Sequence, residues 1–544
     1  MKKSTFVKGA FITTLGIIIT KILGIIYVIP FHAVIGDEGG ALYGYAYTIY
    51  LLFMSLSSAG IPLAISKIVS EYQTLGYYKA KKRAFILSKR IAFLLGLICF
   101  LIIMIFAPYL AKAVLGNVVG GNTIEDITIV IRVIGTAILI VPVLSIYRGY
   151  FEGHRFMGPP SISQVIEQLI RVLIIIFGSY MAFKVFDLSL TTTVGVALLG
   201  ATIGAFTSYI YLVEKRIKNR RKFNEKIRQV NEPIISDKVI LSKIFYYAIP
   251  FILIDLFKVA YNAVDMLTVV KGLVDVAQYS AVDAETVYSM LSTWALKFNM
   301  ILLAVSTGVI VSLIPNLTES VVSEKKSDIN KKICQALSIL LFLTIPMTLG
   351  ISFLAKPIWI LFYGNSNFGP SVLSFYIFVG LFMGLFTLMV TILQVLKDNK
   401  IVIVSLLAGV IIKILLNTNL LMAFNNMALP PYYGVITASI LGYLISFIIC
   451  VVSLKRKYEI SFESVSRNLI DIICATILMV LVLVVVKAII PLYSSVRIIN
   501  LLIIIVYAII GIVVYFVYAH FTGLINKVFG KGVLRTVKKI IIRK

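Results

Sequence analysis

The stretch IAFLLGLICFLIIMIFAPYL, residues 91–110, runs for twenty residues without a charge. Lys89 and Arg90 precede it directly, and Lys112 follows it after a single alanine. An α-helix rises about 1.5 Å per residue, so about 20 apolar residues cross the roughly 30 Å of hydrocarbon in a bilayer. The stretch therefore predicts a membrane-spanning helix, with estimated bounds of 87–111.

Similar apolar blocks recur along the 544 residues, of which 60% are hydrophobic and 14% charged. An average soluble chain has about 45–50% apolar and about 25% charged residues, so a soluble fold could not bury this much apolar surface. We predict an all-α polytopic membrane protein with fourteen transmembrane helices at 7–30, 41–66, 87–111, 127–147, 161–183, 191–213, 243–270, 289–316, 333–355, 371–396, 401–424, 434–454, 468–490 and 497–520.

The distribution of the 51 Lys and Arg residues predicts the orientation of these helices. With the N-terminus in the cytoplasm, the external segments hold only Lys112, Lys184, Lys271, Lys356 and Arg497. Cytoplasmic retention of Lys and Arg orients membrane proteins, so we predict a cytoplasmic membrane protein with both termini inside. The net charge of +27 then attracts anionic membrane lipids. Nucleic acid is not expected as a partner, because no soluble domain carries a basic face.

The even number of helices suggests two halves that enter the membrane in the same direction, as parallel repeats do. We predict a first six-helix lobe at 1–213, a basic cytoplasmic linker at 214–242 and a second six-helix lobe at 243–454 in pseudo-two-fold relation. The two extra helices fall in 455–520. Basic and apolar residues at helical spacing in 521–544 predict an amphipathic tail on the inner leaflet.

A small-residue and proline element recurs in the second helix of each half. It reads SSAGIPLAISKIVSEY at 57–72 and STGVIVSLIPNLTES at 306–320. Helix bending and ordinary close helix packing remain open as explanations. The candidate hinge residues are Gly60, Pro62, Gly308 and Pro315.

Ionisable residues inside the predicted helices are the candidates for function. Each costs at least about 2.5–3.5 kcal/mol at the bilayer centre, so it usually faces a cavity or a partner. Glu167 and Arg171 stand at i and i+4 and can pair. Asp255 and Lys258 stand at i and i+3 and are expected to pair in the same way. The other candidates are Lys21, Lys67, Arg132, Asp265, Lys297 and Lys413. Cations without an obvious partner on the same helix predict a cavity for an anionic substrate, of which phosphate is the obvious example.

The sequence shows none of the enzyme signatures considered next. The three histidines have no metal-ligand spacing, and no phosphate-binding G-x-x-x-x-G-K-[ST] loop occurs. The longest predicted external segments are too short to form a catalytic domain, at 112–126, 271–288 and 356–370. A transporter is therefore favoured over an enzyme. An antiporter of cationic drugs would need acidic residues to dominate the first lobe, and a scaffold for cell-wall enzymes would tolerate neutral replacement of the lysines.

Four segments carry a family resemblance. They are TKILGIIYVIP at 20–30, AGIPLAISKIVSEY at 59–72, YRGYFEGHRFMGPPSISQVIEQLIRV at 147–172 and STGVIVSLIPNLTES at 306–320. Over essentially its whole length, the chain resembles the polysaccharide-biosynthesis branch of the multidrug/oligosaccharidyl-lipid/polysaccharide (MOP) exporter superfamily. More narrowly, it is similar to the MurJ-type lipid II flippases of Gram-positive bacteria, which include sporulation paralogues.

The resemblance implies two six-helix lobes around a central cavity, with the two extra helices forming a groove for a lipid tail. It implies that the protein carries the undecaprenyl-pyrophosphate-linked peptidoglycan precursor lipid II from the inner to the outer leaflet by alternating access. We expect the protein to be a monomer. The expected pyrophosphate-binding residues are Lys21, Lys67, Glu167, Arg171 and Lys297. Gram-negative members carry further cavity arginines at positions taken here by Tyr27 and by Phe53 or Met54.

The resemblance leaves the driving force and the glycan open. Asp265, Asn417 and Thr437 could occupy the sodium site of some relatives, and Lys413 could fill that site as a tethered cation. Sodium coupling, proton coupling and the membrane potential are the alternatives, and no cofactor is expected. Alternative functions are transport of another undecaprenyl-linked glycan, for teichoic acid, capsule or spore cortex, and cation-coupled drug antiport.

Overall fold

The structure is a computed structural model that describes residues 16, 19–21, 23, 24, 27–58, 60–223 and 232–530. The chain divides into two compact units, Met1–Thr293 and Trp294–Lys544, and each is described by itself. Most of the predicted first helix at 7–30 lies outside the described residues, as do the middle of the predicted linker and most of the predicted tail.

Long apolar helices make up both units, and the described residues contain no strand. Thirteen of these helices, among the residues described, are long and apolar enough to cross a membrane. They correspond one by one to the second through fourteenth predicted helices, because the apolar blocks that drive the prediction form the spans. The protein is therefore an all-α multi-pass membrane protein, as predicted.

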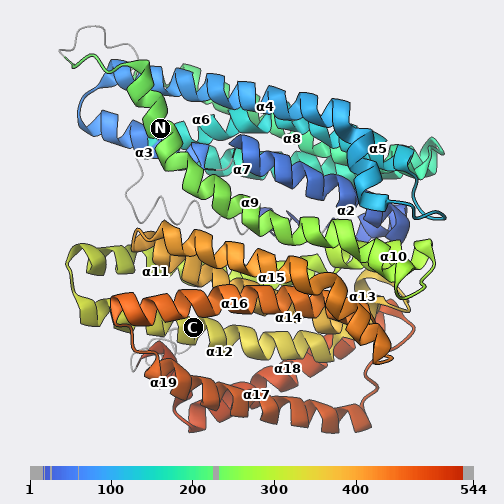
Figure 1. Cartoon of the computed structure of the whole chain (residues 1–544). Coiled ribbons are helices and arrows are strands. Elements are labelled where there is room, and N and C mark those ends of the chain that lie inside the picture. The colour runs from blue at the N-terminus through green and yellow to red at the C-terminus, as the bar shows by residue number, and fades with distance from the viewer. Residues whose placement is uncertain are drawn as a thin grey trace. The chain divides into compact units, whose positions relative to one another are not determined.

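Unit 1 holds nine described α-helices and short irregular helices between them (Figure 1). The α-helices are α2 Val28–Ser58, α3 Ile61–Thr74, α4 Tyr78–Leu115, α5 Ile124–Gly135, α6 Val141–Gly153, α7 Gly158–Leu173, α8 Leu190–Lys218, α9 Asp237–Asp275 and α10 Ala281–Ser289. The short ones are the 3₁₀-helix η1 Thr136–Leu139 and the π-helices η2 Ile174–Gly178, η3 Met181–Val185 and η4 Met290–Trp294, the last of which crosses into unit 2. Helix α2 packs against α5, α8, α9 and α10, while α7 packs against α8.

Glycine and proline positions break the helices where the backbone needs them. The kink in α2 falls at Gly36, whose φ of 62° is left-handed. Gly60, with a φ of 75°, caps the start of α3, and Pro62 lies in its first turn. A Cβ atom on Gly60 would lie 2.4 Å from the carbonyl oxygen of Ala248 on α9, so the break also allows close packing. A hinge role for these residues stays a prediction.

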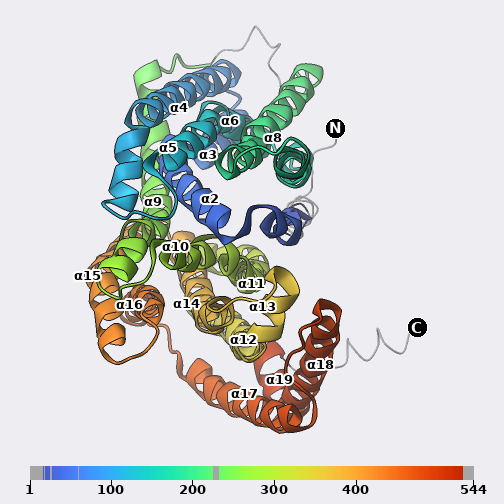
Figure 2. The ribbon, with the colours of Figure 1, turned by 90° about the vertical axis from the view of Figure 1, so that its right-hand side faces the viewer.

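Unit 2 contains the remaining helices (Figure 2). They are α11 Leu296–Val322, α12 Lys326–Phe353, α13 Ala355–Tyr363, α14 Gly369–Val395, α15 Asn399–Asn426, α16 Tyr432–Tyr458, α17 Glu463–Ile489, α18 Arg497–Phe521 and α19 Leu524–Phe529. Helix α14 packs against α11, α12 and α16, and α15 pairs with α16. Helix α17 packs against both α12 and α18. Gly308 and Pro315, the other candidate hinge residues, lie within the continuous helix α11.

The compact units do not follow the repeat inferred from sequence. Unit 1 extends past residue 213, because α9 packs along α2, α3 and α4, and α10 packs on α2. These two helices come from the segment assigned to the second lobe. The lobe boundaries at 1–213 and 243–454 therefore stay a prediction, separate from the compact units.

Candidate functional site

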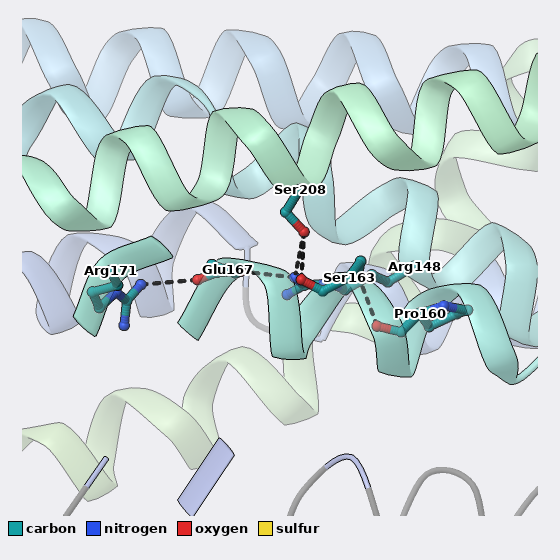
Figure 3. Close-up of polar contacts among 6 residues, drawn as sticks. All are labelled: Arg148, Pro160, Ser163, Glu167, Arg171 and Ser208. Atoms are coloured by element: carbon teal, nitrogen blue, oxygen red, sulfur yellow. Dashed lines mark hydrogen bonds and ion pairs between the residues drawn. The ribbon is translucent and has the colours of Figure 1, made fainter. Parts of the chain in front are cut away.

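Three helices of unit 1 bring together a cluster of charged and polar side chains (Figure 3). Helix α6 supplies Arg148, α7 supplies Ser163, Glu167 and Arg171, and α8 supplies Ser208. One guanidinium nitrogen of Arg148 donates to Glu167 Oε2 at 2.7 Å, and its Nε donates to Ser163 Oγ at 2.9 Å. Arg171 donates to the other carboxylate oxygen, Glu167 Oε1, at 2.8 Å. A single carboxylate thus bridges two arginines.

This cluster, which we call the arginine cluster (Arg148, Glu167 and Arg171), carries a surplus positive charge within a membrane-spanning segment. The side chains are only 16%, 14% and 15% exposed, respectively. Two guanidinium groups face one carboxylate, so these three residues together carry one net positive charge. Glu152, one turn after Arg148 on α6, also interacts with Arg148. The Nε atom of Arg171 is also buried without a hydrogen-bond partner. Charge-assisted hydrogen bonds to phosphate are strong, so a cluster of this kind has the chemistry that phosphate binding needs.

Tight packing of α7 on α8 positions the arginine cluster. Ser208 Oγ donates to the carbonyl oxygen of Ser163 at 2.6 Å, and Ser163 Oγ donates to that of Pro160 at 2.7 Å. A Cβ atom on Gly204 of α8 would lie 2.6 Å from the carbonyl oxygen of Glu167. The glycine therefore lets the two backbones approach closely and fixes where the carboxylate stands.

Sequence reasoning found two of the three charged members of this cluster. The pairing of Glu167 with Arg171, predicted from their i, i+4 spacing, is confirmed. Arg148 was missed because it follows the predicted helix 127–147 and was assigned to the cytoplasmic side. Its place in the family-like segment 147–172 was the one available signal.

The other predicted phosphate-binding cations come from other helical segments of the chain. Lys21 is half-buried, and Lys297 is half-buried in the first turn of α11 in unit 2. Lys67 is exposed on α3, with its ammonium 3.9 Å from the ring centroid of Tyr247. Among the described residues of the predicted phosphate-binding set, Glu167 and Arg171 form a direct ion pair. A binding role for each of the five residues stays a prediction.

Lys413, on α15 of unit 2, is completely buried. Its ammonium donates to the hydroxyl of Ser439 at 2.6 Å and to the carbonyl oxygen of Val435 at 3.1 Å, both on α16. Asn417 is also buried, one turn after Lys413. Thr437 instead donates to the carbonyl of Tyr433. Asp265, the remaining residue of the predicted ion site, is half-buried on α9 in unit 1.

An apolar cavity of about 370 Å³ opens among α12, α13, α17 and α18 within unit 2. Its walls include Pro346, Met347, Leu483 and Ile512. The two lining tyrosines direct their hydroxyls to backbone carbonyls, Tyr515 to Phe342 at 2.8 Å and Tyr507 to Ile490 at 2.7 Å. Polar groups of the wall are therefore satisfied internally, and the cavity suits an aliphatic chain.

A buried acid was overlooked because it fell in the predicted external segment 271–288. Glu285 of α10 is 1% exposed. Its Oε2 accepts from the backbone N of Asn122 at 2.9 Å and from the Asn122 side chain at 2.8 Å, and its Oε1 accepts from Tyr45 at 3.4 Å. One carboxylate thus ties α10 to α2 and to the loop between α4 and α5.

We expect Glu285→Ala to destabilise the protein by about 1–3 kcal/mol, because it leaves the buried donors of Asn122 without an acceptor. Thermal unfolding of the purified protein in detergent measures the loss. Glu125→Ala is the matched control, since Glu125 is exposed on the neighbouring helix α5. Equal melting temperatures for the two variants would show that Glu285 does not hold these elements together.

Comparison with known proteins identifies the family. A family model described as "Polysaccharide biosynthesis protein" matches residues 6–313, more than half of the chain. "Lipid II flippase MurJ" of Bacillus subtilis (strain 168) is 32% identical over 543 residues, which cover 97% of each chain. "Stage V sporulation protein B" of the same organism is 30% identical over 238 residues, 42% of this chain and 43% of that protein.

Solved structures show the same fold. "Lipid II flippase MurJ, inward closed conformation" aligns with a TM-score of 0.67 at 16% identity, covering 94% of this chain and 98% of the other. An inward-facing "multidrug resistance MATE family transporter of the MOP superfamily" aligns with a TM-score of 0.63 at 11% identity, covering 83% and 99%. Because the family model matches residues 6–313 and a relative is 32% identical over 97% of each chain, the chain belongs to the polysaccharide biosynthesis protein family.

Proposed function

We propose that this protein is a flippase that carries lipid II, the undecaprenyl-pyrophosphate-linked peptidoglycan precursor, from the inner to the outer leaflet of the cytoplasmic membrane by alternating access. The observation that carries the proposal is the arginine cluster, whose surplus positive charge is held within a membrane-spanning segment. The similarity to Bacillus subtilis MurJ over 97% of each chain supports the same substrate class. No catalytic step is required for such transport.

Arg171 is the primary phosphate-binding residue in this proposal. Its guanidinium binds phosphate oxygens in a planar fork, whereas Lys21, Lys67 and Lys297 act as point charges. Glu167 accepts from both arginines and so limits the net charge of the cluster. In this proposal, the single net positive charge of the cluster gives an affinity for pyrophosphate that allows both binding and release.

The apolar cavity beside α17 and α18 provides a place for the polyprenyl tail. Its lining is almost wholly apolar, so a polyprenyl tail meets surroundings there as apolar as the lipid that it leaves. The tail can stay in this cavity or in the surrounding lipid while the polar headgroup crosses the membrane. Both termini lie in the cytoplasm in this proposal, as the distribution of Lys and Arg favours.

We propose that the membrane potential, not sodium, drives transport. An interior-negative potential favours outward movement of an anionic headgroup by about 2.3 kcal/mol per charge per 100 mV. The Lys413 ammonium already lies against the hydroxyl and carbonyl oxygens that a hard cation would bind. It therefore takes the place of a coupling ion in unit 2.

Transport should accordingly continue at an unchanged rate when external sodium is replaced by potassium or choline. Arrival of lipid II at the outer leaflet of cells measures this rate, at constant membrane potential. A loss of transport in sodium-free medium would contradict the tethered-cation role of Lys413. Lys413→Ala is the companion variant, because it removes the ammonium from its oxygen ligands. Sodium could then bind there, and transport would again require sodium.

The identity of the transported glycan is tested by genetic complementation. In a strain whose other lipid II flippases are depleted, expression of this protein should restore growth and outer-leaflet lipid II. The alternative, favoured by similarity to a sporulation protein, is a different undecaprenyl-linked glycan such as a spore-cortex precursor. Failure to restore growth despite normal membrane expression would move the assignment to that alternative.

A further inference from the structure

Helix α2 carries a row of tyrosines on one face. Tyr43, Tyr47 and Tyr50 are spaced by four and three residues, so their side chains lie together along the helix. The rings of Tyr43 and Tyr47 stack with centroids 5.6 Å apart and planes 11° from parallel. Tyr47 and Tyr50 follow at 5.7 Å with a 41° tilt. We call these three residues the tyrosine row.

The tyrosine row lies beside the arginine cluster. Helix α2 packs against α6 and α8 and against η2, the segment that begins three residues after Arg171. The three phenol groups interact electrostatically with Arg171, and Tyr50 also interacts with Glu167. Tyr43 and Tyr50 are only 6% and 4% exposed, whereas Tyr47 between them is half-buried. Aromatic surface therefore remains accessible next to the surplus positive charge.

Packing in the protein interior accounts for the buried rings of Tyr43 and Tyr50, but it gives no role to the half-buried ring of Tyr47. Tyr47 presents both a ring face and a hydroxyl, and such amphipathic surface suits a ligand with C–H faces and hydroxyl groups. A tyrosine also loses little conformational entropy when it binds, because it has only two side-chain torsions. Sugars have this combination of surfaces.

We propose that the tyrosine row is a sugar-binding subsite adjoining the phosphate-binding Arg171. The first sugar ring of the headgroup packs against Tyr47, which Tyr43 and Tyr50 hold from either side. This inference rests on the proposed flippase function and adds to it a determinant of specificity. It makes the protein selective for a glycosylated lipid over the bare pyrophosphate carrier.

The test compares two lipids that differ only in the sugar-containing headgroup. The purified full-length protein in nanodiscs is titrated with lipid II and, separately, with undecaprenyl pyrophosphate. Tyr47→Ala and Tyr47→Leu should each weaken lipid II binding by about tenfold and leave undecaprenyl pyrophosphate binding unchanged. Leucine fills most of the space of the tyrosine side chain. A loss of lipid II affinity in Tyr47→Leu therefore reports the missing aromatic face rather than a packing defect.

Two control variants complete the comparison. Tyr109→Ala, on the 70% exposed Tyr109 of α4, should change neither affinity. Arg171→Gln should weaken both lipids, because it removes the phosphate partner that they share. The sugar subsite is overturned if both Tyr47 variants bind lipid II like the wild type, or if they weaken the two lipids equally. Failure of the wild type to bind either lipid would instead overturn the flippase proposal together with this one.

Discussion

Glu167→Leu is expected to destabilise the protein by about 3–5 kcal/mol and to abolish transport, because it leaves Arg148 and Arg171 buried without their shared counter-ion. The two guanidinium groups would then repel each other in a segment from which water is largely excluded. Thermal unfolding in detergent measures the stability, and membrane expression provides an independent reading.

A surface pair serves as the matched control for Glu167. Glu214 and Lys218 form the same i, i+4 arrangement on α8, but their side chains are 50% and 66% exposed. Solvent screens such a pair, so Glu214→Leu should change the stability by no more than about 1 kcal/mol. Similar shifts for Glu167→Leu and Glu214→Leu would show that the arginine cluster does not depend on its central carboxylate.

Arg171→Gln is expected to lower transport at least tenfold while the protein still folds. The substitution removes the surplus charge, but the 2.7 Å pair of Arg148 with Glu167 remains and keeps the carboxylate compensated. Arg171→Lys should recover part of the activity, since it restores the charge without the planar fork. Outer-leaflet lipid II in cells that depend on this protein measures each rate.

Arg132→Gln is the control for removing an arginine from a membrane-spanning helix. Arg132 is exposed on α5, and its Nε donates to the carbonyl oxygen of Met104 at 3.3 Å. Its loss should leave transport near the wild-type rate. If Arg171→Gln and Arg132→Gln behave alike at equal expression, the surplus charge of the cluster has no special role in transport.

Hydropathy predicted the membrane-spanning helices well, but not where they end. The apolar stretch 91–110 forms the core of α4, yet that helix begins at Tyr78, a full three turns before the apolar block. Charged residues continue a helix into water as readily as apolar ones, so composition marks the bilayer rather than the helix. The same limit hid Arg148, which lies just past a predicted boundary but contacts Glu167 of α7 and Ser208 of α8, with its side chain only 16% exposed.

The spacing of residues along the sequence predicted contacts within one helix, but it did not predict contacts between helices. The Glu167–Arg171 pair followed from a four-residue separation, whereas the bonds from Arg148 to Glu167 and from Ser208 to Ser163 depend on how helices meet. Glu285 escaped for a similar reason, since its partner Asn122 lies 163 residues away. Pattern reasoning thus located the charged helix faces but not the partners that complete the site.

Translocation by the purified protein tests the central claim most directly. Full-length protein is reconstituted into liposomes with lipid II, and a membrane-impermeant enzyme that consumes lipid II is added outside. With the protein present, the inner-leaflet pool should also become accessible, and Arg171→Gln should slow its appearance at least tenfold. An inner-leaflet pool that stays protected with correctly folded wild-type protein, under an imposed membrane potential, would contradict the assignment as a lipid II flippase.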